Sequence, residues 1–167
     1  LAFVGMGLQG LSASMIFGMG AVFANIIGMT NQQGSIFLAS FTIANVVMQY
    51  PIGRMSDRFD RRLVILIVAS ISALAAAIAS IVGLSNYWTL LGLTAIFGGF
   101  SMTIYSLCIA HANDYLSPSQ MVGTASALIT VNGIGAIFGP PIIAALVDLF
   151  GSYMFFASLS AVHFGLG

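Results

Sequence analysis

The sequence is 167 residues long, with 59% hydrophobic and only 5% charged residues and a mean hydropathy of +1.07. Soluble domains carry about a quarter charged residues, so a chain this apolar could not cover its own surface in water. The net charge of zero gives no indication of a nucleic-acid partner, and the single cysteine, Cys108, excludes an internal disulfide bond.

A chain that uses lipid as its solvent must satisfy every backbone N–H and C=O group internally, which only helices and closed barrels achieve. Barrel strands would show alternating segments of about 10 residues with polar inward faces. This chain instead has long runs of Leu, Ile, Ala, Phe and Gly without a period of two. The composition therefore predicts an all-α membrane protein.

A helix needs ~20 mostly apolar residues to span a membrane. Turn signals divide the chain into six apolar segments, which we predict to be such helices. The predicted helices cover residues 2–29, 35–52, 63–83, 89–110, 121–147 and 152–167. The last helix is cut off within an apolar run, and the chain begins at Leu1 rather than Met. We therefore expect a fragment of a longer protein, with both natural ends missing.

A cluster of charges lies between the second and third predicted helices. Residues 1–52 and 63–113 carry no charge, whereas residues 53–62 contain two of the four acids and every basic residue of the chain: Arg54, Arg58, Arg61 and Arg62. This pattern predicts a short aqueous loop at 53–62, and the positive-inside rule places that loop on the cytoplasmic side. The alternative is a solvated loop whose charges only set the topology.

The fifth predicted helix contains glycines and prolines at its centre. Gly135 and Gly139 form a GxxxG face, which allows helix backbones to approach closely. Pro140 and Pro141 remove two N–H groups and clash with carbonyls one turn earlier. A kink is therefore predicted at the level of residues 139–141.

The pattern Gly53-x-x-x-Asp57-Arg58-x-x-Arg61-Arg62 between two spanning helices resembles the signature loop of the major facilitator superfamily, although Asp60 stands where that family often has glycine. The segment from Gly135 to Pro140 resembles the Gly-x-x-x-Gly-Pro element of the same family. Residues 51–58 and 111–114 further resemble the second half of bacterial permeases of the YcaD-like kind.

The resemblance implies one six-helix half of a twelve-helix transporter in a bacterial inner membrane. Its partners would be the lipid bilayer, a missing N-terminal six-helix half and a small-molecule substrate. Asp57, Arg58 and Arg62 would act as a latch between the halves, in a loop that also includes Gly53 and Arg61. The Gly–Pro element would bend the fifth helix and shape the central cavity.

Polar side chains within the apolar runs are the candidates for that cavity, because polar groups in hydrocarbon are costly. In the family, the first, second, fourth and fifth helices of a half contribute most, and these helices carry Gln9, Asn45, Gln49, Tyr105 and Asn132. The alternative for each residue is an interhelical hydrogen bond, worth ~0.6 kcal/mol on average. His163, in the last predicted helix, is more simply a packing residue than a titrating one.

The resemblance implies secondary active transport of a small solute by alternating access. A non-transporting membrane scaffold or subunit on the same fold is the alternative, because fold does not dictate function. An enzyme is not indicated, since the sequence shows no nucleophile–base–acid set, no metal-ligand spacing and no phosphate-binding glycine loop. We therefore expect no catalytic residues, no metal site and no cofactor.

Overall fold

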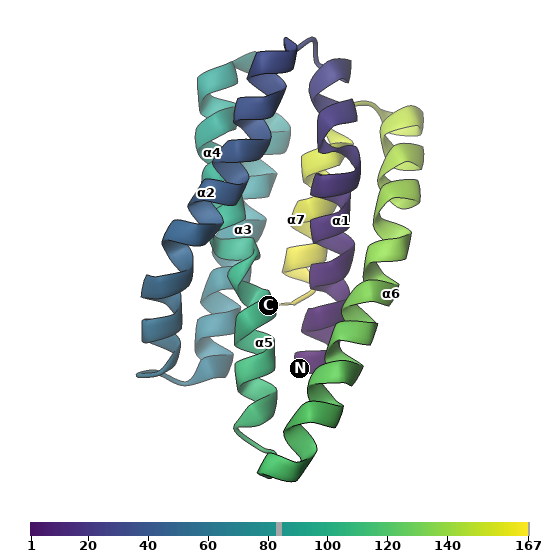
Figure 1. The fold of residues 1–167 in the computed structure, drawn as a ribbon. Coiled ribbons are helices and arrows are strands. Elements are labelled where there is room, and N and C mark those ends of the chain that lie inside the picture. The colour runs from purple at the N-terminus through teal and green to yellow at the C-terminus, as the bar shows by residue number, and fades with distance from the viewer. Residues whose placement is uncertain (83–84, 167) are drawn as a thin grey trace.

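The computed structural model describes residues 1–82 and 85–166, and this part of the chain is helical without strands (Figure 1). The α-helices of this part of the chain are α1 (Ala2–Ile26), α2 (Asn31–Ser56), α3 (Arg61–Ile81), α4 (Tyr87–Ser101), α5 (Thr103–Asn113), α6 (Pro118–Phe150) and α7 (Met154–Phe164). The predicted ends of two helices, at residues 83 and 167, lie outside the described residues. The all-α prediction is confirmed.

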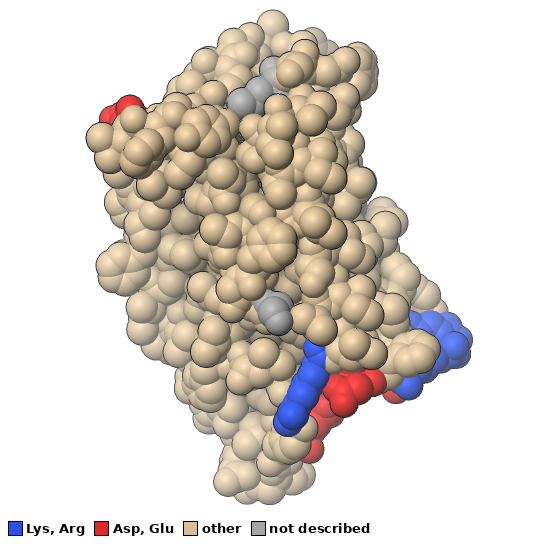
Figure 2. All heavy atoms as spheres, turned by 180° about the vertical axis from the view of Figure 1, so that it is seen from behind, with Lys and Arg blue, Asp and Glu red and all other residues tan. Residues whose placement is uncertain are grey.

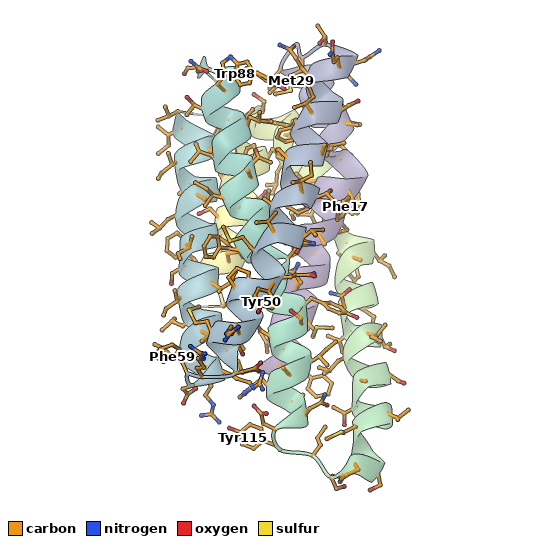
Figure 3. All side chains as sticks on the ribbon, turned by 60° about the vertical axis from the view of Figure 1, so that its left-hand side comes forward. Phe17, Met29, Tyr50, Phe59, Trp88 and Tyr115 are labelled. Carbon is orange, nitrogen blue, oxygen red and sulfur yellow. The ribbon has the colours of Figure 1, made fainter. Side chains whose placement is uncertain are left out.

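Five segments of the described chain are long and apolar enough to cross a membrane. Four are α1, α2, α3 and α6, and the fifth is formed by α4 and α5 together, from Tyr87 to Asn113. The remaining helix, α7, has 11 residues and is shorter than a span. The helix axes are roughly aligned and form a bundle. Met29 and Trp88 lie at one end of the bundle, and Phe59 and Tyr115 lie at the other (Figure 3).

Four helices, α2, α3, α4 and α6, begin earlier than the sequence predicted, and side chains at their starts account for this. The polar stretch at 30–34 is not a turn before α2. Its Thr30 hydroxyl accepts the Gln33 N–H at 3.2 Å, and the Gln33 side chain accepts the Thr30 N–H at 3.0 Å. This capping box starts α2 at Asn31. At the start of α6, the Gln120 side chain likewise accepts the Ser117 N–H at 3.2 Å, and it also accepts the Ser117 hydroxyl at 3.0 Å.

The predicted loop at 53–62 is wrong in its extent. The helix α2 continues through Pro51 to Ser56, and α3 begins at Arg61, so only residues 57–60 lie between the two helices. The Asp60 carboxylate accepts the Arg62 N–H at 2.8 Å, which caps the N-terminus of α3. Gly53 and Arg54 therefore project from a helix and not from a flexible loop.

The fourth predicted helix, 89–110, is divided at Met102 into α4 and α5. Two hydroxyls near the break donate to backbone carbonyls three residues earlier: Thr103 to Phe100 at 2.6 Å and Ser106 to Thr103 at 2.9 Å. Such side-chain bonds compete with the helical ladder. We attribute the division of the span to this competition.

The helix pairs with the most extensive contacts are α1 with α6, α2 with α4, and α3 with both α7 and α4 (Figure 1). Buried phenylalanines fill one end of the core, where the Phe23 and Phe155 rings stack with centroids 4.2 Å apart. Aliphatic residues such as Val68 and Leu107 fill the other end. The helices α2 and α6 contribute few buried residues, so most of their surface has no partner within the described chain.

Candidate functional site

The charged side chains gather at one end of the bundle, which we call the charged end (Figure 2). It contains the four arginines of residues 54–62 together with Asp57, Asp60 and Asp114. The one remaining charge, Asp148, belongs to the last turn of α6 at the far end of the bundle. The charged end is therefore the first candidate site.

Arg61 is the centre of this cluster. Its guanidinium lies 2.7 Å from Asp114 and 3.3 Å from Asp57, and it also donates to the Ser56 hydroxyl at 3.2 Å. The Arg61 side chain is 23% exposed, so these contacts are partly shielded from water. One residue thus joins the end of α2, the start of α3 and the end of α5.

Arg62 makes a second link to the end of α5. It donates to the Tyr115 hydroxyl at 3.1 Å, and its guanidinium carbon lies 5.9 Å from the centre of that ring. The Tyr115 ring in turn meets His111 edge to face. Sequence reasoning missed Asp114 and Tyr115 as partners, because they lie more than 50 residues from the arginines and no local pattern connects them.

The other two arginines have different surroundings. Arg54 donates to the Tyr50 hydroxyl one turn earlier, at 2.9 Å. Arg58 has no hydrogen bond or ion pair to a side chain in the described part of the chain. Of the three residues expected in the latch, Arg62 therefore has a partner within the described chain, whereas Arg58 has no side-chain partner there.

A hollow of about 370 Å³ lies beside this cluster on the surface of α2, lined by Gln49, Tyr50, Gly53, Arg54 and Asp57. Gly53 faces open space, since a Cβ added there would meet no atom within 4 Å. The Asp57 side chain is 70% exposed even though one of its oxygens contacts Arg61. Packing among the described residues therefore does not require glycine at position 53.

The Gly–Pro segment packs against α1. A Cβ at Gly135 would overlap the Gly7 carbonyl, and a Cβ at Gly139 would overlap the Ser14 hydroxyl. The predicted GxxxG pair thus faces a neighbouring backbone. The helix α6 runs without interruption through Pro140 and Pro141, and the kink expected there stays a prediction.

The five candidate cavity residues fall into two groups. Gln9 and Asn132 lie between helices: Gln9 is 2% exposed and contacts the Met102 sulfur at 3.6 Å, and Asn132 donates to the Met6 carbonyl at 3.0 Å. Tyr105 is half-buried. No pocket found among the described residues is lined by more than one of the five candidates.

Asn45 and Gln49 form the second group. They lie one turn apart on the little-buried helix α2 and are joined by a side-chain contact of 3.5 Å. An apolar groove of about 380 Å³ lies between α2 and α4, with walls that include Ile43, Val47 and Phe100, but neither amide lines it. An exposed amide, Gln49, and a partly buried one, Asn45, therefore lie on the same helix as an apolar groove of ligand size.

The length, composition and packing of these helices define a multi-pass integral membrane protein. The sequence model of the Major Facilitator Superfamily matches residues 2–166, which is nearly the whole chain. The chain belongs to the Major Facilitator Superfamily, a family of membrane transporters. The resemblance seen in the sequence is confirmed at the level of the family.

Curated relatives carry the name uncharacterized MFS-type transporter YcaD. The protein from Escherichia fergusonii is 24% identical over 157 residues, and those from Escherichia coli O17:K52:H18 and Escherichia coli K12 / DH10B are 26% identical over the same length. Each match covers 94% of this chain but only 40% of the relative. The chain thus spans less than half the length of the curated relatives that it matches.

Proposed function

We propose that this chain is the second six-helix half of a secondary transporter, which moves a small solute across a bacterial inner membrane by alternating access. The remainder of the protein supplies the first half. The charged end lies in the cytoplasm, because it holds every arginine of the chain. The length of the relatives supports this proposal, since 60% of each lies outside the match.

The observation that carries the proposal is the surface formed by Gly53 and Asp57. Arg61 holds the turn at 57–60 to α5, so Asp57 is presented from a fixed position. Gly53 leaves open space one turn away, which is what the close approach of a second helix needs. A free helix N-terminus from the first half would complement the Asp57 carboxylate through its unpaired N–H groups and its dipole. Asp57 and Gly53 then form a latch that stabilises one end state, and Arg58 is free to join it.

The substrate contacts of this half are amides and not charges. Asn45 and Gln49 are the candidates that remain accessible. Gln49 lines the hollow on α2, whereas the apolar groove between α2 and α4 is lined by other residues of the same helix. No charged residue occurs in 1–52, 63–113 or 115–147. A charged solute would lack a counter-charge from this half, so the chemistry fits a neutral or amphiphilic small molecule.

The test uses the full-length protein reconstituted into lipid vesicles. A panel of labelled neutral and amphiphilic solutes is followed for uptake and efflux, with protein-free vesicles as the blank. We expect flux of at least one solute, reduced by Asn45→Ala with Gln49→Ala. The matched control is Leu74→Ala with Ile78→Ala, which changes two exposed positions of α3 with the same spacing. Absence of flux at normal protein incorporation would favour the membrane scaffold instead.

A further inference from the structure

Asp148 is set apart from every other charge of the chain. It lies in the last turn of α6. Figure 2 shows one red patch at the opposite end of the bundle from the blue arginine atoms. The sequence has no lysine, and its arginines all fall within residues 54–62. The far end of this half therefore carries one negative charge and no Lys or Arg side chain to neutralise it.

The helix itself does not favour this carboxylate. The C-terminus of a helix carries a partial negative charge, so an acid in the last turn is unfavourable. A neutral polar residue would serve the end of α6 better. The role of Asp148 is therefore to be found in what lies next to it.

A small hollow adjoins Asp148 between α1, α6 and α7. Its other walls are apolar and include Met19, Phe23, Val147 and Phe155. Its volume is about 100 Å³, well below the ~300–1,000 Å³ of a pocket for a drug-sized ligand. The hollow is thus sized for a single side chain, with apolar walls and one carboxylate at its edge.

Lysine and arginine match that combination. Their stems of three or four methylene groups lie along apolar surface, while the charged head reaches for a polar partner. A neutral apolar side chain would fill the hollow but leave Asp148 unmatched. A basic side chain does both, and this chain has none to offer at this end.

We propose that the hollow beside Asp148 receives a lysine or arginine from the part of the protein outside this chain, on the side of the membrane opposite the charged end. The inference rests on the proposed two-half transporter. It fits the exposed surface of α6, which packs chiefly on α1 and has few buried residues. The ion pair forms a second latch, which closes the far end when the latch at Asp57 opens.

Cysteine cross-linking in the full-length protein tests this contact. In a background without other cysteines, including Cys108→Ala, Asp148→Cys is paired in turn with cysteine at each basic residue near the far end of the other half. The matched control places the cysteine at Leu149, the exposed neighbour in the same turn, which is not part of the hollow. A disulfide requires Cα atoms within ~7 Å, so we expect one basic position to oxidise about tenfold faster with position 148 than with position 149.

A double-mutant cycle measured by Tm then tests whether the two cross-linked positions form an ion pair or are only close in space. Asp148→Asn and neutralisation of the cross-linked base should each lower Tm by ~2 °C, and the double variant should lower it no further than either single one. Additive shifts, or no basic position that cross-links faster than the control, would overturn the proposal and leave Asp148 as a solvated charge or a contact for lipid or solute. Neither measurement needs a known substrate, so a positive result without any solute flux would count against the proposed transport and not against the ion pair.

Discussion

The Arg61 guanidinium lies 2.7 Å from the Asp114 carboxylate, although the two residues are separated by two helical spans. Arg61 occupies the first turn of α3, where the helix dipole disfavours a cation. Its place is therefore explained by its acceptors, Asp114, Asp57 and Ser56, and not by the helix that carries it. The pair fixes the short α2–α3 turn to the end of α5.

Replacement of Arg61 should loosen this end of the bundle. Arg61→Gln removes the cation from two carboxylates and a buried hydroxyl, and we expect a loss of stability of ~1–2 kcal/mol, because the side chain is only 23% exposed. Arg58→Gln is the matched control, since Arg58 has no such partners in the part of the chain that the structure describes. Thermal unfolding of the full-length protein in detergent measures both. Equal Tm values for the two variants would contradict this role of Arg61.

The α1–α6 contact should be sensitive to a single methyl group. A Cβ at Gly10 would overlap the Asn132 carbonyl, which belongs to a rigid helix backbone. Because the helices must separate to make room, Gly10→Ala should destabilise the protein by roughly 1–3 kcal/mol. Gly92→Ala is the control, because a Cβ there meets nothing within 4 Å, and alanine should stabilise α4 by ~0.5–1 kcal/mol. A shift of the same sign for both variants would disagree with this packing.

The sequence predicted the helical class and the family because both depend on long runs and on one dense motif. Helix ends were less well predicted. The start of α2 depends on Thr30 and Gln33, whose spacing is a capping box that the sequence does contain but that was interpreted as a turn. The charged loop ends earlier than predicted because Asp60 is the N-cap of α3. In the sequence, Asp60 stands among arginines and was interpreted as part of the loop.

The partners of the charged cluster could not be predicted from one sequence. Asp114 and Tyr115 are brought to the arginines by the packing of α5 on α3, and a hydropathy pattern does not specify which helices are neighbours. The same reason separates Asn132, which donates to a backbone carbonyl of α1, from Gln49, which stays exposed. A polar residue in an apolar helix looks the same in the sequence whether it faces a neighbour or an open surface.

His163 should act as a structural link between α7 and α4. It is fully buried, its Nε2 lies 2.8 Å from the Ser101 hydroxyl, and its Nδ1 lies 2.8 Å from the Leu159 carbonyl. His163→Ala leaves a cavity beside Phe97 and an unpaired hydroxyl, so we expect a loss of ~2–4 kcal/mol. Ser101→Ala removes only the hydrogen bond and should cost about 1 kcal/mol. Thermal unfolding of both variants checks the order, and a larger effect of Ser101→Ala would reverse the argument.

Asp57 should matter for turnover more than for folding. Asp57→Asn keeps the size of the side chain, and Arg61 retains its 2.7 Å contact with Asp114, so this half should still assemble. The variant loses the exposed negative charge that we propose meets a helix N-terminus of the other half. We expect solute flux in vesicles to fall about tenfold, equivalent to ~1.4 kcal/mol, while the amount of protein in the membrane changes little.

Asp60→Asn is the matched control for Asp57→Asn, because it removes an equal charge three residues away. Asp60 accepts the Arg62 N–H to cap α3, and asparagine caps a helix about as well as aspartate, so both flux and stability should stay close to those of the parent protein. Equal losses of flux in the two variants would mean that the net charge of this end matters, and not the position of Asp57. Unchanged flux in Asp57→Asn at normal membrane levels would rule out the latch, because the Gly53 surface would then be open for a reason unrelated to the approach of the other half.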